Sequence, residues 1–101
     1  MKYAVRFTEE ADADLERLYE YIFQREGGDL AVAGRAMDAI RSSLKLLETN
    51  PFAFRKAGTD SLQRELVIGF SASGYVVLYE IEDSETVTVL AVRHQREDDY
   101  H

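Results

Sequence analysis

The spacing of the apolar residues changes once along this chain, around the Asn50-Pro51 pair, and that change limits the folds open to it. Before the pair, apolar residues recur every three or four positions, which is the period of an amphipathic helix. From about residue 62 onward, the pattern is typical of strands. Because the residue before a proline avoids the helical conformation, no helix is expected to continue past Asn50. After a short N-terminal segment, the chain should therefore be helical up to this pair and stranded beyond it.

Local signals divide these two halves into six elements. Residues 2–7 alternate as a strand does, and Thr8 and Asp29 are expected to cap two helices that the Gly27-Gly28 pair separates. The Asp83-Ser84 pair is typical of a tight hairpin turn. The six expected elements are a strand at 2–7, helices at 8–27 and 29–47, and strands at 62–68, 75–81 and 86–93. A loop is expected at 52–61.

This order predicts one α+β domain over residues 1–101, in which a two-helix hairpin packs on a small antiparallel sheet completed by three C-terminal strands. A two-residue turn in the last hairpin would place apolar side chains on both faces of the sheet. One face would carry Tyr75, Val77, Tyr79, Leu90 and Val92, and the other Val76, Leu78, Val87, Val89 and Ala91. Because one helical hairpin covers a single face, we expect another chain to cover the second face. A different register, or a loop folded across the sheet, is the alternative.

Composition excludes several classes of function. The chain of 101 residues has no cysteine and two histidines, so neither a disulfide framework nor a metal centre is expected, and no cofactor is predicted. Its net charge of −7 gives no overall field that attracts nucleic acid and suits a positively charged partner. Its apolar runs are too short to span a bilayer, so a cytoplasmic protein without membrane contact is expected. The charged outer faces of the helices, including Glu16, Glu20, Arg35, Asp38 and Arg41, are expected to be solvated surface.

Short stretches over nearly the whole length occur together, and in the same order, in one known family. They are residues 7–15 (FTEEADADL), 19–22 (YEYI), 46–51 (LLETNP), 62–66 (LQREL), 75–81 (YVVLYEI) and 89–97 (VLAVRHQRE). With these stretches the chain resembles the RelE/ParE toxin family of bacterial type II toxin–antitoxin systems, which serve in plasmid stabilisation. The resemblance implies a small toxin that a cognate antitoxin neutralises by wrapping its surface.

The family contains two functional classes, and the resemblance leaves both open. ParE-like members bind and block DNA gyrase, whereas RelE-like members cut messenger RNA on the ribosome. Nuclease members are typically basic, so the acidic charge of this chain favours the ParE-like class. A third possibility is a member that only stabilises its antitoxin or represses the shared operon.

A RelE-like nuclease would need a cation for the phosphate and groups that move protons. Arg64, His94 and Tyr100 are the candidate catalytic residues for that case, His94 and Tyr100 by resemblance to the nuclease members. Each has a structural alternative. Arg64 would instead bond to Glu65, Glu80 or a strand-end carbonyl, His94 would be a solvent-facing strand terminus, and Tyr100 a tail residue.

Four further cations are candidate binding residues. They are Arg55, Lys56, Arg93 and Arg96, which together with Arg64 could meet at one end of the sheet and form a local anion site. The acidic residues 97–99 next to Arg96 would weaken such a site.

Overall fold

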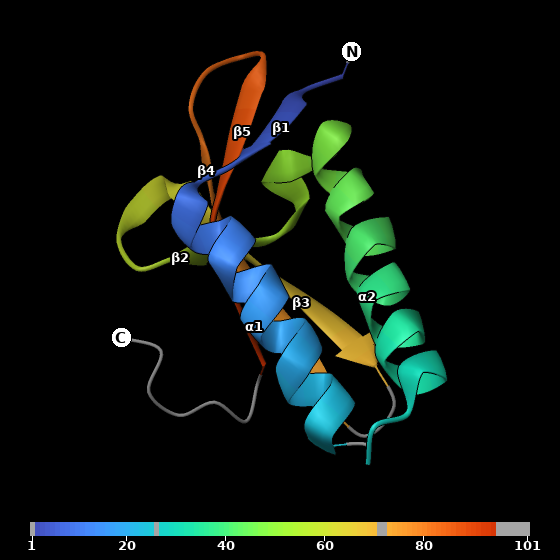
Figure 1. The fold of residues 1–101 in the computed structure, drawn as a ribbon. Helices are drawn as coiled ribbons and strands as arrows, with labels where there is room; N and C mark the ends of the chain where they lie inside the picture. Colours follow the sequence, from blue (N-terminus) through green and yellow to red (C-terminus); the bar gives the residue numbers. More distant parts are fainter. Residues whose placement is uncertain (1, 26, 71–72, 95–101) are drawn as a thin grey trace.

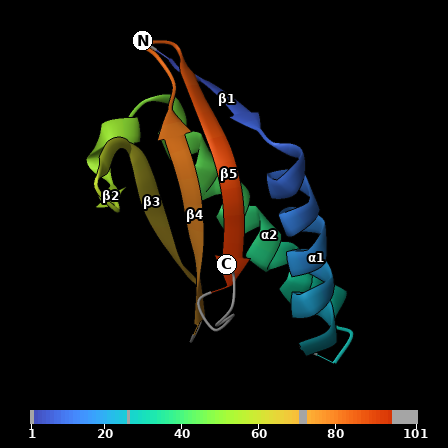
Figure 2. The same cartoon turned by 90° about the vertical axis from the view of Figure 1, so that its left-hand side faces the viewer.

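A computed structural model describes residues 2–25, 27–70 and 73–94 of the chain (Figure 1). Its elements are β1 (Ala4–Phe7), α1 (Glu9–Arg25), α2 (Leu30–Leu44), the short 3-10 helices η1 (Lys45–Glu48) and η2 (Pro51–Ala53), β2 (Arg55–Ala57), β3 (Asp60–Phe70), β4 (Ser73–Ile81) and β5 (Thr86–His94). The strands form one sheet in the order β1-β5-β4-β3-β2. Both long helices lie on the same side of this sheet (Figure 2). The predicted α+β fold is confirmed.

The helix boundaries follow from the capping residues that the sequence predicted. The Thr8 hydroxyl accepts from the Ala11 amide (3.0 Å) at the start of α1. The Asp29 carboxylate accepts from the amides of Ala31 and Val32 (2.9 and 3.3 Å) at the start of α2. Between the helices, Gly27 and Gly28 have positive φ values of 69° and 82°, which glycine adopts without strain.

Two features of the sheet differ from the prediction. β1 pairs with β5 in parallel, so the sheet is mixed rather than antiparallel throughout. Residues 55–57, predicted to be loop, form β2, which pairs with the beginning of β3 in antiparallel fashion. Gly58 between them has a φ of 67° and makes the tight turn possible. A three-residue strand is too short to show a period of two, which explains why the sequence pattern did not reveal it.

A β-bulge in β5 changes which side chains face the helices. Leu78 pairs with Ala91 whereas Tyr79 pairs with Val89, so Leu90 is an extra residue in β5. The prediction that Val87 and Val89 share a face with Val76 and Leu78 is wrong for a different reason. The turn is longer than the two residues predicted, so Ile81 pairs with Val87 and Tyr79 pairs with Val89. Both valines are fully buried beneath the helices, on the same side as Val92.

The core fills the space between the helix pair and one face of the sheet. It contains Ala11, Leu18, Ile22, Ala33, Ala36, Met37, Ile40, Leu44, Leu47, Leu66, Ile68, Tyr75, Val77, Tyr79, Ile81, Val87, Val89 and Val92. The opposite face lacks Val87 and Val89, the two valines that the prediction placed there. We call Val67, Val76, Leu78 and Ala91 the open strip; Val67 is 42% exposed and the other three are partly exposed. No helix in the described residues is long and apolar enough to cross a membrane.

Candidate functional site

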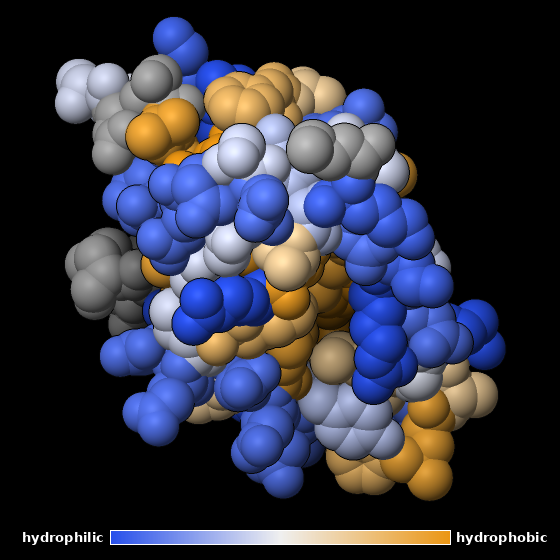
Figure 3. Space-filling view, turned by 90° about the horizontal axis from the view of Figure 1, so that it is seen from above, coloured by the Kyte–Doolittle hydropathy of each residue, from blue (hydrophilic) through white to orange (hydrophobic). Residues whose placement is uncertain are grey.

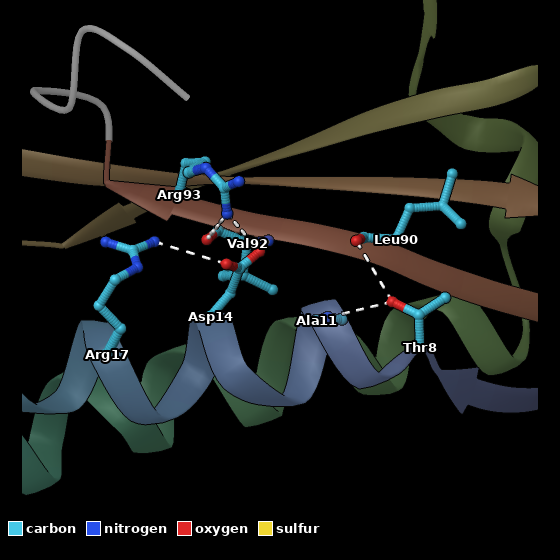
Figure 4. A network of polar contacts seen from close by, with 7 residues as sticks. All are labelled: Thr8, Ala11, Asp14, Arg17, Leu90, Val92 and Arg93. Carbon is cyan, nitrogen blue, oxygen red and sulfur yellow. Dashed lines mark hydrogen bonds and ion pairs between the residues drawn. The ribbon is translucent and has the colours of Figure 1, made fainter. Parts of the chain in front are cut away.

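Beyond the end of the β1–β5 pairing, side chains of Thr8 and of α1 form hydrogen bonds with backbone groups at the edge of β5. The last pair of that ladder is Phe7 with Val89. Beyond it, the Thr8 hydroxyl donates to the Leu90 carbonyl (3.4 Å), and the Asp14 carboxylate accepts from the Val92 amide (3.0 Å), as Figure 4 shows. The helix thus takes over backbone groups that a neighbouring strand would otherwise bond.

Asp14 also collects positive charge at this edge. It is 8% exposed, forms an ion pair with Arg93, and lies 3.6 Å from the Arg17 guanidinium (Figure 4). Arg93, a predicted binding residue, therefore joins β5 to α1. We call Asp14, Arg93 and the Val92 amide the α1–β5 junction.

Arg64, a predicted catalytic residue, holds the segment made of η2 and the residue after it. Its Nη1 donates to the carbonyls of Phe52 (3.0 Å) and Phe54 (2.9 Å), and its guanidinium lies 5.4 Å from the centre of the Phe52 ring. Glu65 and Glu80, the carboxylates first considered for it, have other partners. Glu65 pairs with Arg55 (2.9 Å), and Glu80 accepts from Gln63 (3.4 Å).

Tyr79 anchors the same segment from the core side. Its hydroxyl donates to the carbonyl of the buried Pro51 (2.5 Å). Burial raises the pKa of Tyr79 from 10.0 to about 12, although the positive charge of Arg64 opposes this change. The phenol is therefore a neutral donor at physiological pH.

Because of this raised pKa, the free energy of unfolding should fall between about pH 10 and 12. The unfolded chain releases the Tyr79 proton near pH 10, whereas the folded protein retains it to about pH 12. Tyr79→Phe should remove this part of the alkaline decline. It should also cost about 1–3 kcal/mol at neutral pH, because the Pro51 carbonyl loses its donor. Urea denaturation at pH 8, 10 and 11 measures both effects; parallel pH curves for the two proteins would show that Tyr79 is not the group responsible.

His94 is enclosed between α1 and the sheet rather than facing solvent, and its exposure is 1%. Its ring lies 5.3 Å from the rings of both Tyr21 and Tyr75. Arg25 Nη1 donates to its Nε2 (3.1 Å), since arginine has no acceptor. The structural alternative of a solvent-facing strand terminus for His94 is therefore wrong.

The strand register places Arg64 and His94 far apart. Arg64 pairs with Tyr79 of β4, whereas His94 pairs with Tyr75 from the other side. The four-residue step along β4 alone is about 13 Å, and two strand spacings add to it. Arg55 and Lys56 lie on β2 beside Arg64, because they pair with Glu65 and Arg64 of β3. Arg93 directly precedes His94 in β5. The candidate cations that the structure describes thus form two groups instead of one. Arg96 and Tyr100 lie outside the described residues.

A surface groove that the sequence did not reveal runs between the helices toward β1. One part, of about 390 Å³, is lined by Leu15, Glu16, Tyr19, Glu20, Met37 and Arg41. A second part, of about 210 Å³, is lined by Val5, Phe7, Arg41, Leu44, Lys45 and Glu48. Figure 3 shows a hollow with a hydrophobic floor between hydrophilic side chains on this side of the molecule. We call both parts the helix groove.

The wall of the helix groove along α1 is acidic, with Glu16 and Glu20. The wall along the end of α2 and η1 carries both signs of charge: Arg41, which pairs with Asp38 (3.3 Å), Lys45 and Glu48. Sequence analysis treated Glu16, Glu20 and Arg41 as plain solvated surface. The sequence signal that could have revealed the groove is the wide apolar stripe of the first helix. Leu15 and Tyr19 belong to this stripe, but the core buries them only in part. Among the described residues, no cluster of three or more His, Cys, Asp or Glu side chains could hold a metal ion.

Comparison with known proteins identifies the family. The family model for the ParE toxin of the type II toxin–antitoxin system parDE matches residues 5–99. Since this match covers nearly the whole chain, the protein belongs to the ParE toxin family. A solved structure titled chromosomal ParDE TA system from P. aeruginosa shares the fold, with a TM-score of 0.71 and 16% identity over 92% of this chain and 96% of that one. A search of curated protein sequences found no significant match.

Proposed function

We propose that this ParE-family toxin is neutralised by a cognate antitoxin and acts in the cytoplasm by binding and inhibiting DNA gyrase. The observation that favours binding over RNA cleavage is the position of the two candidate catalytic residues. Arg64 and His94 lie at different ends of the sheet, and His94 is buried beneath α1. One bound phosphate could not contact both side chains, whereas acid–base catalysis requires its groups within hydrogen-bond reach of the reacting atoms.

The helix groove is our candidate docking site for the antitoxin. An amphipathic helix places a strip of apolar side chains into such a groove. The acidic wall favours one orientation of this helix, in which cations of the antitoxin lie along Glu16 and Glu20. We further propose that an extended part of the antitoxin covers the open strip, as expected for the uncovered face of the sheet.

Expression of this protein alone should arrest growth, and co-expression of the antitoxin, sought in the neighbouring reading frame, should restore it. Messenger RNA recovered from arrested cells should show no new cleavage sites. A culture that grows normally would favour a family member without toxic activity. A mapped cleavage pattern that disappears in Arg64→Ala would favour the RelE-like nuclease.

A further inference from the structure

The outer edge of β1 is an unpaired strand edge. β1 ends the sheet, and no further strand lies beyond it among the described residues (Figure 2). The amides of Ala4 and Thr8 donate to carbonyls of β5 (2.7 and 3.1 Å), so it is the even-numbered residues that bond to β5. The amides and carbonyls of Val5 and Phe7 therefore face away from β5, and no described group bonds to them. Such an edge is a template for a further strand.

η1 covers only the beginning of this edge. The Tyr3 amide, which also faces away from β5, donates to the Glu48 carbonyl (2.7 Å). One backbone contact of this kind thus exists within the fold, and it stops short of Val5. The donors and acceptors of Val5 and Phe7 stay open to a partner backbone.

The second part of the helix groove lies directly beside the open edge. Val5 and Phe7 line it from β1 and Leu44 lines it from the end of α2, around a volume of about 210 Å³. Phe7 is 37% exposed there. A strand added to β1 would lie about 4.8 Å from it, with every second side chain on the face that Val5 and Phe7 share. The groove therefore suits large apolar side chains at alternate positions of the added strand.

Two cations flank the edge, one on each face of the sheet. Arg6 lies between the two outward-facing residues and projects from the other face, whereas Lys45 lines the groove. Both are exposed, and neither forms an ion pair with a described residue. Glu48, the carboxylate in this part of the groove, pairs with Lys2 (3.8 Å). Carboxylates that alternate with the apolar side chains of an added strand would lie beside Arg6, and opposite charges on neighbouring strands stabilise their pairing.

We propose that an extended segment of the antitoxin adds to the outer edge of β1 as a further strand, with apolar side chains in the groove and carboxylates beside Arg6. Hydrogen bonds to the backbone of Val5 and Phe7 supply affinity, and the alternate side chains supply specificity. Arg41 lines both parts of the helix groove, so a helix bound in the first part can continue as a strand beside the second. The inference rests on the proposed function for the source of the segment.

A second copy of this chain suits the edge less well. Antiparallel pairing of two β1 strands with Val5 opposite Phe7 would set the two Arg6 side chains face to face. Like charges in directly opposed positions destabilise a sheet. Each copy also carries a net charge of −7, so two copies repel each other.

The test is an NMR titration of the ¹⁵N-labelled full chain with the synthetic peptide Glu-Ile-Glu-Val-Glu-Thr, blocked at both ends. In the free protein, the amides of Val5 and Phe7 should exchange with solvent at least about tenfold faster than those of Ala4 and Arg6, which bond to β5. Saturating peptide should slow the exchange of Val5 and Phe7 about tenfold or more and leave Ala4 and Arg6 unchanged.

Three altered peptides separate the backbone contribution from the charge contribution. One carries N-methyl groups on Ile and Val, and another carries them on the three Glu residues. Because only alternate amides of an added strand face β1, one of these two should lose about tenfold or more in affinity and the other should retain it. The uncharged Gln-Ile-Gln-Val-Gln-Thr should bind at least about threefold more weakly, since it offers Arg6 no carboxylate.

Variants of the protein test the same edge from the other side. Val5→Pro removes one outward amide but no bond to β5, and proline is tolerated at such edge positions. It should weaken peptide binding about tenfold or more, whereas the matched control Val5→Ile keeps the amide and should change affinity by less than about threefold. Tyr19→Ala, in the first part of the groove, should leave peptide affinity unchanged, so a failure of helix docking and a failure of strand addition are distinguishable.

Three results would overturn the proposal. They are equal affinities of all four peptides, no binding at millimolar concentration, and slow exchange of the Val5 and Phe7 amides in the free protein. The last result would show that another part of the chain, or a second copy of it, already covers the edge. Sedimentation would tell these two occupants apart.

Discussion

Asp14→Ala should lower the free energy of unfolding by about 3–5 kcal/mol, the usual cost of removing one partner from a buried ion pair. Three contacts depend on this carboxylate: the ion pair with Arg93, the hydrogen bond from the Val92 amide, and the weaker contact with Arg17. Without Asp14, the Val92 amide loses its described acceptor and the side chain of Arg93 loses this ion pair. The loss should appear as a lower urea midpoint with an unchanged m-value.

Asp12→Ala provides the control for this experiment. Asp12 is exposed in the first turn of α1, where its charge contributes only through the helix dipole, about 0.3–1 kcal/mol. Asp14→Asn should fall between the two alanine variants, since its amide oxygen can still accept from Val92 but carries no charge. Equal stability of the two alanine variants would contradict the role assigned to the α1–β5 junction.

Tyr19→Ala should weaken antitoxin binding about thirtyfold or more, which corresponds to about 2 kcal/mol. Tyr19 is partly exposed in the wall of the helix groove, next to Leu15 and Met37. Aromatic side chains at such central positions commonly contribute the most to binding. Calorimetric titration of the purified antitoxin measures the change.

Leu46→Ala is the matched control for the groove. Leu46 is 45% exposed in η1 and is not among the residues that line either part of the groove. Its truncation should change antitoxin affinity by less than about threefold, because scattered surface contacts contribute little. If the two variants bind equally well, the antitoxin docks elsewhere on the toxin.

The helices and their caps could be predicted because the signals are local. Thr8 and Asp29 accept from amides two or three residues away, and the helical period is visible in any window of a dozen residues. The bulge in β5 is different. It coincides with contacts from Thr8 to Leu90 and from Val92 to Asp14, which join residues 82 and 78 positions apart. No local pattern records such a contact, so the bulge was not predicted. The register next to the turn was also predicted incorrectly, because the turn is longer than two residues and Ile81 pairs with Val87.

For the candidate site too, the sequence revealed local signals but not contacts between distant residues. The strand pattern marked Arg64 as a charge on the core-facing side, and this was a real signal of an unusual environment. Its acceptors proved to be the carbonyls of Phe52 in η2 and of Phe54 just after it, which no local pattern places beside Arg64. The burial of His94 depends on where α1 ends, which places Tyr21 and Arg25 against it. The separation of the cations into two groups follows only from the strand register.

A supercoiling assay with purified DNA gyrase tests the central claim most directly. Micromolar toxin should inhibit the conversion of relaxed plasmid to its supercoiled form, and an equimolar amount of the cognate antitoxin should restore it. This inhibition does not require catalysis by Arg64 or His94, since neither residue is assigned a catalytic role. Full supercoiling in the presence of toxin that still arrests growth would contradict the account and assign the toxicity to another target.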